Sequence, residues 1–187
     1  VRCARRLGDT EGRKILIIGL GPVGLSCALV QAFKGAEVMG ADIHQYRVDL
    51  SRKLGALKAV NTGTHNLKEE VENWTDGKGV DIAILAAGSN EALMTAVELV
   101  KQQGIVYSVA DFSEATINPS AIFVHKEITM TGSLYYTSAD WKEMIALHGA
   151  GLPYGKLVTH IFPFDQAQKA FDTFVSGNTG KVVLFYN

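Results

Sequence analysis

The chain has 187 residues, of which 47% are hydrophobic and 20% are charged, and its formal net charge at pH 7 is -1. This length is enough for one domain with a core, and the balanced charge argues against nucleic acid or an anionic membrane as the main partner. The two cysteines, Cys3 and Cys27, exclude a disulfide framework and a structural zinc site built on a C-x-x-C pair. The apolar runs are too short for a membrane span, and no signal peptide is visible, so we expect a cytoplasmic protein.

The first residues, VRCARRLGD, have the pattern of a helix end, with basic residues in the last turns and Gly8 as the stop. Because the sequence starts inside this pattern and with valine, we expect a piece of a longer protein. Residues 1–12 would then close a helix that links two domains.

Apolar runs and helical patterns alternate after this start. Strands are expected at residues 14–18, 37–41, 58–61, 80–86, 105–109 and 127–132. Helices are expected at residues 22–34, 45–54, 65–73 and 90–101, with a short helix that Asn118 caps and Pro119 begins. Strand–helix–strand units imply parallel pairing, and near-continuous apolar strands imply helices on both faces. We therefore predict an α/β fold with a doubly wound (Rossmann) parallel sheet over residues 13–150.

The pattern changes near residue 137. We expect a helix over residues 139–148, a Gly- and Pro-rich link, a short apolar run at 157–162, a helix over 166–176 capped by Asp165, and a strand over 181–186. These elements are too few to bury a core of their own. Residues 151–187 are therefore expected to belong to another domain.

A glycine pattern, GLGPVG, follows the first expected strand and places Gly19, Gly21 and Gly24 in the spacing G-x-G-x-x-G. The pattern alone is weak, but here a strand precedes it, a helix follows it and Asp42 ends the next strand. Gly19 allows a tight turn, Gly21 lets the backbone approach a pyrophosphate, and Gly24 lets helix and strand pack closely. Pro22 suits the first helical position, where free N–H groups face the phosphates. A dinucleotide site is predicted.

The acid and its neighbours indicate which dinucleotide. The distance along the chain from Gly24 to Asp42 is close to the roughly 20 residues expected of a ribose-binding acid. A carboxylate there accepts both ribose hydroxyls and repels a 2′-phosphate, which favours NAD over NADP; a solvated helix cap is the competing interpretation. Arg47 either reaches the ribose or a phosphate, or lies on a solvated helix face. The small residues of LAAGS, at the end of the fourth strand, leave room for adenine or its ribose.

Six stretches point together to one family: GRKILIIGLGPVGLSCALVQAFKGAEVMGAD, RVDLSRKLGA, GVDIAILAAGS, GIVYSVA, EITMTGSLYY and LVTHIFPFDQAQKAFDTFVSGNTGKVVLFYN. They resemble the medium-chain dehydrogenase/reductase family, the zinc-type alcohol and polyol dehydrogenases, over nearly the whole chain. The resemblance implies that the pyrophosphate is bound by Gly19, Leu20, Gly21, Pro22 and Val23, and the adenosine ribose by Asp42, Ile43 and Arg47. It further implies an adenosine contact at Ala86 and Ala87, a nicotinamide contact at Val109, Ala110 and Leu134, a substrate-cleft position at Tyr135 and a basic position near the pyrophosphate at Lys181. The family often has glycine where Ala110 stands.

The sequence departs from the family in what it lacks. The family's catalytic zinc ligands lie in an N-terminal domain around a small β-barrel, and its structural zinc lobe has four cysteines; neither is found here. We therefore expect no catalytic residue and no metal ligand in this chain, with zinc only in the N-terminal domain of the parent protein. The five histidines are scattered and are interpreted as solvated or capping residues. Residues 151–187 resemble the segment that completes the catalytic domain.

The resemblance implies the NAD(H)-binding part of an enzyme that transfers hydride between an alcohol or polyol carbon and nicotinamide, inactive by itself. The family pairs the strand EITMTGS across a two-fold axis, which implies a homodimer or tetramer. Two alternatives remain. A zinc-free, NADPH-using reductase of the quinone reductase type is opposed by Asp42, and a non-catalytic NAD-sensing module is opposed by the family-like C-terminus. The substrate is not identified by any residue of the chain.

Overall fold

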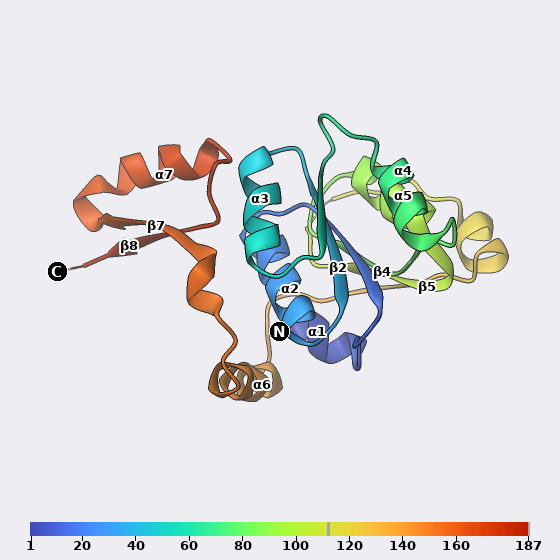
Figure 1. Cartoon of the computed structure of the whole chain (residues 1–187), viewed down its shortest axis with the longest axis horizontal. Helices are drawn as coiled ribbons and strands as arrows, with labels where there is room; N and C mark the ends of the chain where they lie inside the picture. Colours follow the sequence, from blue (N-terminus) through green and yellow to red (C-terminus); the bar gives the residue numbers. More distant parts are fainter. Residues whose placement is uncertain (112, 187) are drawn as a thin grey trace.

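The computed structural model describes residues 1–111 and 113–186; Asn187, the last residue of the expected C-terminal segment, lies outside them. Its centre is a six-stranded sheet in the order β3-β2-β1-β4-β5-β6, in which every pair of neighbours is parallel (Figure 1). The strands are β1 (Lys14–Ile18), β2 (Glu37–Asp42), β3 (Lys58–Asn61), β4 (Val80–Leu85), β5 (Val100–Ser108) and β6 (Thr129–Gly132). This order confirms the predicted doubly wound fold.

Helices cover both faces of this sheet, because its strands are apolar on both sides. Ile15 and Ile17 belong to one core cluster, whereas Leu16 and Ile18 belong to the other. The first cluster includes side chains of α1 (Arg2–Leu7), α2 (Pro22–Phe33) and α3 (Gln45–Lys53). The second includes side chains of α4 (Leu67–Thr75) and α5 (Asn90–Leu99). Alternate residues of one strand thus pack under different helices.

Several helix boundaries differ from the prediction by one or two residues, and two of these differences have a clear cause. The helix α4 begins at Leu67 rather than residue 65, because Asn66 caps it by accepting the N–H of Lys68 at 3.0 Å. The helix α5 ends at Leu99 rather than residue 101, because Val100 already pairs with Val80 as the first residue of β5. The pairing of β4 with β5 then becomes irregular before it resumes further along both strands. The regular part of β5 is residues 105–108, so the predicted strand 105–109 starts later than β5 and runs one residue past its end.

The connection into β6 contains a short helical turn, η1 (Ser120–His125), of the π type. The predicted cap is present, because the Asn118 side chain accepts the N–H of Ala121 at 3.2 Å, although the turn is counted from Ser120. The strand β6 starts at Thr129 rather than residue 127, since Glu127 has a positive φ of 54° that is incompatible with a strand.

The C-terminal part contains α6 (Ser138–Gly149) and a 3-10 turn, η2 (Tyr154–Leu157), followed by the elements that we call the C-terminal lobe, residues 158–186. These are β7 (Val158–Pro163), the 3-10 turn η3 (Phe164–Gln166), α7 (Ala167–Val175) and β8 (Lys181–Phe185). The strands β7 and β8 pair in parallel, and α7 packs on both. The predicted cap at Asp165 is wrong, because Asp165 lies inside η3 and α7 begins at Ala167.

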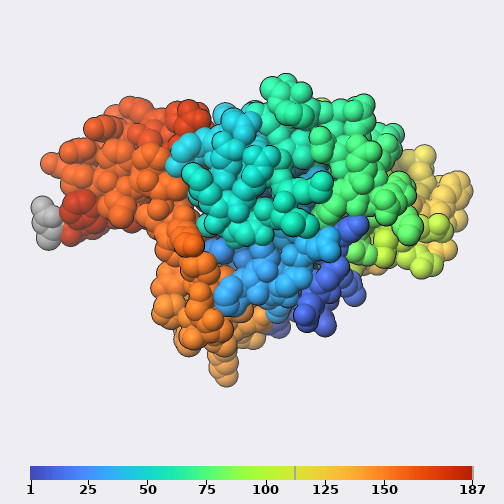
Figure 2. All heavy atoms as spheres, in the orientation of Figure 1, coloured from blue at the N-terminus to red at the C-terminus, as the bar shows by residue number. Residues whose placement is uncertain are grey.

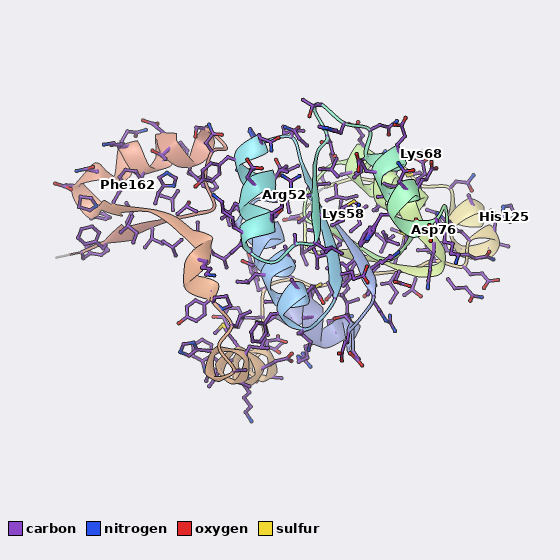
Figure 3. All side chains as sticks on the ribbon, in the orientation of Figure 1. Arg52, Lys58, Lys68, Asp76, His125 and Phe162 are labelled. Atoms are coloured by element: carbon purple, nitrogen blue, oxygen red, sulfur yellow. The ribbon has the colours of Figure 1, made fainter. Side chains whose placement is uncertain are left out.

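The lobe forms one end of the molecule, orange to red in Figure 2, while the turn η1 lies at the opposite end. Phe162 of β7 is correspondingly far from Asp76 and Lys68 at the other side of the sheet (Figure 3). Within the described residues, no helix has both the length and the apolar character that are needed to cross a bilayer.

Candidate functional site: a cavity at the carboxyl edge of the sheet

The glycine turn between β1 and α2 has the backbone geometry that the motif predicts. Gly19 has a φ of +91°, and a Cβ on it would come within 2.9 Å of the backbone nitrogen of Ala87. A Cβ on Gly24 would overlap the carbonyl oxygen of Gly19, so no larger residue fits where α2 crosses the turn. The Gly19 N–H donates to the carbonyl of Ala41 at 2.8 Å, which joins the turn to β2.

Gly21 is the residue of the motif that faces open space. It is the N-cap of α2, Pro22 is the first helical residue, and a Cβ on Gly21 would have no neighbour within 4 Å. Gly19 and Gly21 both line a cavity at this edge of the sheet. The space beside Gly21, together with the N–H groups of the first turn of α2, suits an anion that approaches the backbone.

Asp42 is held between two backbone segments. Its Oδ2 accepts the N–H of Leu20 at 2.7 Å, and its Oδ1 accepts the N–H of His44 at 2.8 Å. The residue is only 9% exposed, although it borders the cavity. The hydrogen bond to His44, the N-cap of α3, agrees with the capping interpretation, but burial and the bond to the glycine turn do not fit a solvated cap.

Arg47 does not lie on a solvated helix face. Its Nη1 is 3.9 Å from Oδ2 of Asp42, and both side chains are largely buried. Its Nε is buried and has no hydrogen-bond partner among the described residues. Arg47 lines the cavity, so its positive charge borders the space in which a ribose or phosphate would lie. The guanidinium thus fits a dinucleotide at this position.

The cavity has a volume of about 650 Å³, which is in the range of cofactor sites. It brings together half of the residues that the sequence singled out: Gly19, Gly21, Asp42, Ile43, Arg47, Ala86 and Ala87. The strand ends of β1, β2, β3 and β4 surround it, as expected at the switch point of such a sheet.

The other predicted residues do not line this cavity. The Leu20 side chain is fully buried, and its N–H donates to Asp42. Pro22 and Val23 lie in the first turn of α2. Val109 and Ala110 follow β5, and Leu134 follows β6, further along the same edge of the sheet. Lys181 is exposed at the start of β8 in the C-terminal lobe.

The sequence interpretation missed most of the residues that complete the wall. These are Thr62, His65, Asn66, Leu67, Glu91, Ala92 and Thr95, whereas Ser89, which also lines the cavity, belongs to the stretch LAAGS that was expected to leave room for the adenosine. His65, read as a solvated or capping residue, lines the cavity, and its Nδ1 lies 2.8 Å from the hydroxyl of Thr64. Thr62 and His65 follow β3, and ligands bind at the carboxyl ends of parallel strands, but no further pattern in the sequence marks the missed residues.

No metal centre is evident in residues 1–111 and 113–186, where no three His, Cys, Asp or Glu side chains are grouped so as to hold an ion. Cys3 and Cys27 are both buried in the same core cluster. The described residues therefore fit a dinucleotide but not a zinc ion.

Comparison with known proteins decides the family. The family described as zinc-binding dehydrogenase matches residues 22–149, which is most of the chain. The chain belongs to the zinc-binding dehydrogenase family. These zinc-dependent dehydrogenases in general use NAD, and the match confirms the resemblance on which the sequence interpretation was built.

Relatives and solved structures agree with this assignment. The chain is 33% identical to an L-threonine 3-dehydrogenase of Shewanella frigidimarina (strain NCIMB 400), covering 94% of the chain and 52% of that protein. The structure is similar to a benzyl alcohol dehydrogenase from Acinetobacter calcoaceticus (TM-score 0.89, 25% identity, 99% of this chain and 52% of that one). It is also similar to a 2R,3R-butanediol dehydrogenase from Bacillus subtilis (TM-score 0.84, 25% identity, 95% and 52%). The chain spans about half the length of the relatives that it matches.

Proposed function

We propose that this chain binds NAD(H) and orients the nicotinamide ring in a zinc-dependent dehydrogenase that moves hydride between an alcohol or polyol carbon and the cofactor. The observation that carries the proposal is Asp42, a buried carboxylate held by the glycine turn at the border of a 650 Å³ cavity. A ribose that enters the cavity meets an acceptor already in position. Since its oxygens accept the N–H groups of Leu20 and His44, the acid does not need to be ordered when the cofactor binds.

Each candidate residue, inside the cavity or outside it, is assigned to one part of the cofactor. We assign the pyrophosphate to the segment Gly19, Leu20, Gly21, Pro22 and Val23, and the adenosine ribose to Asp42, Ile43 and Arg47. The adenosine also meets Ala86 and Ala87. We assign the nicotinamide side to Val109, Ala110 and Leu134, and a pyrophosphate contact to Lys181, which the C-terminal lobe would have to bring closer.

The chain's own chemistry is then binding and orientation rather than proton transfer or metal catalysis. We place zinc, which stabilises an alkoxide, and the residues that select the substrate in the part of the relatives that this chain does not span. The lobe leaves apolar side chains exposed, among them Ile161, Phe171 and Phe185. This exposure fits such a division, and we propose that residues 151–187 complete that second domain. The names of the relatives given above refer to different alcohols. The proposed substrate is therefore an alcohol or a polyol, with no particular compound specified.

Two further assignments concern the assembly and the location of the protein. We propose a homodimer or tetramer that pairs β6, because β6 is an edge strand of the six-stranded sheet. We also propose a cytoplasmic location, with no nucleic acid or membrane as partner. Size-exclusion chromatography with light scattering tests the first, and a monomer at all concentrations would contradict it.

The competing functions differ in their cofactor. A quinone reductase-type enzyme would prefer NADPH, but Arg47 is already paired with Asp42, and this carboxylate opposes a 2′-phosphate. A sensing module would bind NAD without needing the exposed apolar lobe. Preference for NAD over NADP therefore separates the first alternative from the proposal.

Titration calorimetry with NAD and NADP tests the assignment of Asp42. We expect NAD to bind more tightly than NADP, and we expect the Asp42→Asn variant to lose about tenfold or more in NAD affinity, because a charged acceptor is removed. The matched control is Asp49→Asn, a half-exposed carboxylate on the helix α3, which follows Asp42 in the chain. Tighter binding of NADP, or an unchanged affinity in the folded Asp42→Asn variant, would contradict the proposal.

A further inference from the structure

A strained and exposed segment follows the edge strand β6. Leu134, Tyr135 and Tyr136 are 68%, 83% and 75% exposed, and Tyr135 has a φ of +52°, a left-handed conformation that a tyrosine rarely adopts. A strained backbone with exposed apolar side chains persists only where its surroundings hold it. The structure shows what holds residues 131–140.

Three arginines of the helix α1 bind this segment, and we call Arg2, Arg5 and Arg6 the arginine clamp. Arg2 Nη1 donates to the carbonyl oxygen of Leu134 at 2.9 Å. Arg6 Nη2 donates to Oγ1 of Thr131 at 3.2 Å. Each bond spans more than a hundred residues of sequence, so the clamp is a tertiary feature rather than a local turn.

Arg5 fixes the other end of the segment through a buried carboxylate. Its Nε donates to Oδ1 of Asp140 at 2.6 Å, and the Asp140 side chain is 2% exposed. The other carboxylate oxygen accepts both the N–H and the hydroxyl of Thr137, at 2.6 and 2.7 Å, and forms the capping box of α6. The clamp therefore holds the backbone on both sides of the strained Tyr135.

The clamped segment lies at the carboxyl edge of the sheet. The Ser133 N–H donates to the carbonyl oxygen of Ser108 at 3.1 Å, and Ser108 is the last residue of β5. Leu134 thus stands next to the strand end that continues into Val109 and Ala110. A dinucleotide with its adenosine at Asp42, on β2, crosses β1 and β4 and ends near β5 and β6.

We propose that the arginine clamp is a positioning device, which fixes residues 133–137 so that Leu134 meets the nicotinamide half of the cofactor. The inference rests on the proposed NAD(H) binding. Arg2, Arg5 and Arg6 do not touch the cofactor; they act through the carbonyl of Leu134 and through Asp140. Pre-ordering of the segment lowers the entropy that nicotinamide binding would otherwise lose.

The experiment compares NADH with ADP-ribose, which lacks the nicotinamide. For the Arg2→Gln variant we expect NADH to bind about three- to tenfold more weakly and ADP-ribose to bind as before, because only the nicotinamide side loses its support. The emission of bound NADH, recorded at saturation, should also shift toward that of free NADH. Arg13→Gln, an exposed arginine in the loop before β1, is the matched control and should change neither ligand.

The Arg5→Gln and Arg5→Lys variants separate positioning from folding. Arg5→Gln is expected to weaken NADH selectively, and Arg5→Lys, which keeps a cationic donor for Asp140, to restore part of the affinity. Equal losses for NADH and ADP-ribose, or unchanged NADH affinity and emission in folded Arg2→Gln, would overturn the inference. If the unaltered chain binds neither ligand, the proposed function itself fails, and the two failures are therefore distinguishable.

Discussion

The six-stranded sheet and the C-terminal lobe are made of the same kinds of element but differ in how they bury apolar side chains. In the sheet, Ile15, Leu16 and Ile17 are fully buried, because helices cover both faces. In the lobe, where α7 packs on β7 and β8, Ile161 and Phe185 remain exposed. Burial of apolar area is the main stabilising term in folding, so the sheet is expected to be stable by itself and the lobe to depend on its neighbours.

The lobe packs against the helix α3, which follows Asp42 in the chain. A Cβ on Gly177 would overlap the ring of His44, and a Cβ on Gly180 would come within 2.8 Å of the Leu50 side chain. The rings of Tyr46 and His160 lie 6.4 Å apart across the same junction. The proposed ribose site and the docking of the lobe therefore share α3, so a change at one is expected to reach the other.

The largest effect is expected inside the sheet, at Gly24→Ala. The added methyl group would overlap the carbonyl oxygen of Gly19, so α2 must move away from β1. We expect a loss of about 3 kcal/mol in the free energy of unfolding, as for other overpacked cores, together with loss of cofactor binding. Urea denaturation and NAD titration measure the two effects.

The control at the same turn is Gly21→Ala, where the methyl group meets open space. Its free energy of unfolding should stay within about 0.5 kcal/mol of the unaltered chain, while the cofactor, if its pyrophosphate lies there, binds more weakly. Equal destabilisation by both substitutions would show that close packing at Gly24 is not what the turn requires.

A smaller effect is expected at the junction of the two regions, at Gly177→Ala. Gly177 has a φ of +80° and contacts His44, so the substitution adds both backbone strain and a clash. We expect a loss of about 1 to 2 kcal/mol and faster proteolysis within the lobe, with the sheet unchanged. Limited proteolysis followed by mass spectrometry locates the cleavage sites.

Gly151→Ala is the matched control for strain without a clash. Gly151 has a φ of +93°, but a Cβ on it would have no neighbour within 4 Å. It should destabilise less than Gly177→Ala and leave the lobe as resistant as before. If both variants open the lobe equally, the contact with His44 does not hold it.

The sheet and the glycine turn could be predicted because their constraints are local in sequence. A positive φ at Gly19, the close crossing at Gly24 and a carboxylate at the end of β2 each leave a trace within a few residues of the motif. Thr62 and Thr95 leave no such trace. They meet in one wall only after β1 and β2 have separated β3 from β4, and a polar residue near a strand end or on a helix has no distinctive pattern.

The C-terminal elements were predicted in kind but not in detail, again for a physical reason. Asp165 has the residue type and position of a helix cap, yet the chain after Pro163 first forms a 3-10 turn, in which Asp165 is an internal residue. Such a turn depends on tertiary packing more than on residue preference. Likewise, the pairing of Arg2 and Arg5 with Leu134 and Asp140 spans the whole sheet domain and has no sequence signature.

The smallest effect concerns α6, the helix between the two regions, and it depends on pH. Hydrogen bonds from the Thr137 hydroxyl and from Arg5 hold the pKa of Asp140 well below its usual range, although burial opposes this. A carboxyl whose pKa is lowered by folding stabilises the folded state above its unfolded pKa, and this contribution is lost as the pH falls through the folded pKa. We therefore expect Asp140→Asn to be less stable than the unaltered chain at pH 7.

The difference in stability between the unaltered chain and Asp140→Asn should shrink as the pH falls below about 4, the usual pKa of an aspartate. Below this pH the carboxyl of Asp140 takes up a proton in the unfolded chain, and at still lower pH it does so in the folded chain as well. Thermal unfolding midpoints at pH 7, 5 and 3 measure the difference, with the exposed Asp172→Asn of α7 as control. A difference that stays constant across this range would mean that Asp140 acts through its shape alone. A difference that shrinks would show that the ionised carboxylate joins α6 to α1, and hence to the sheet rather than to the lobe.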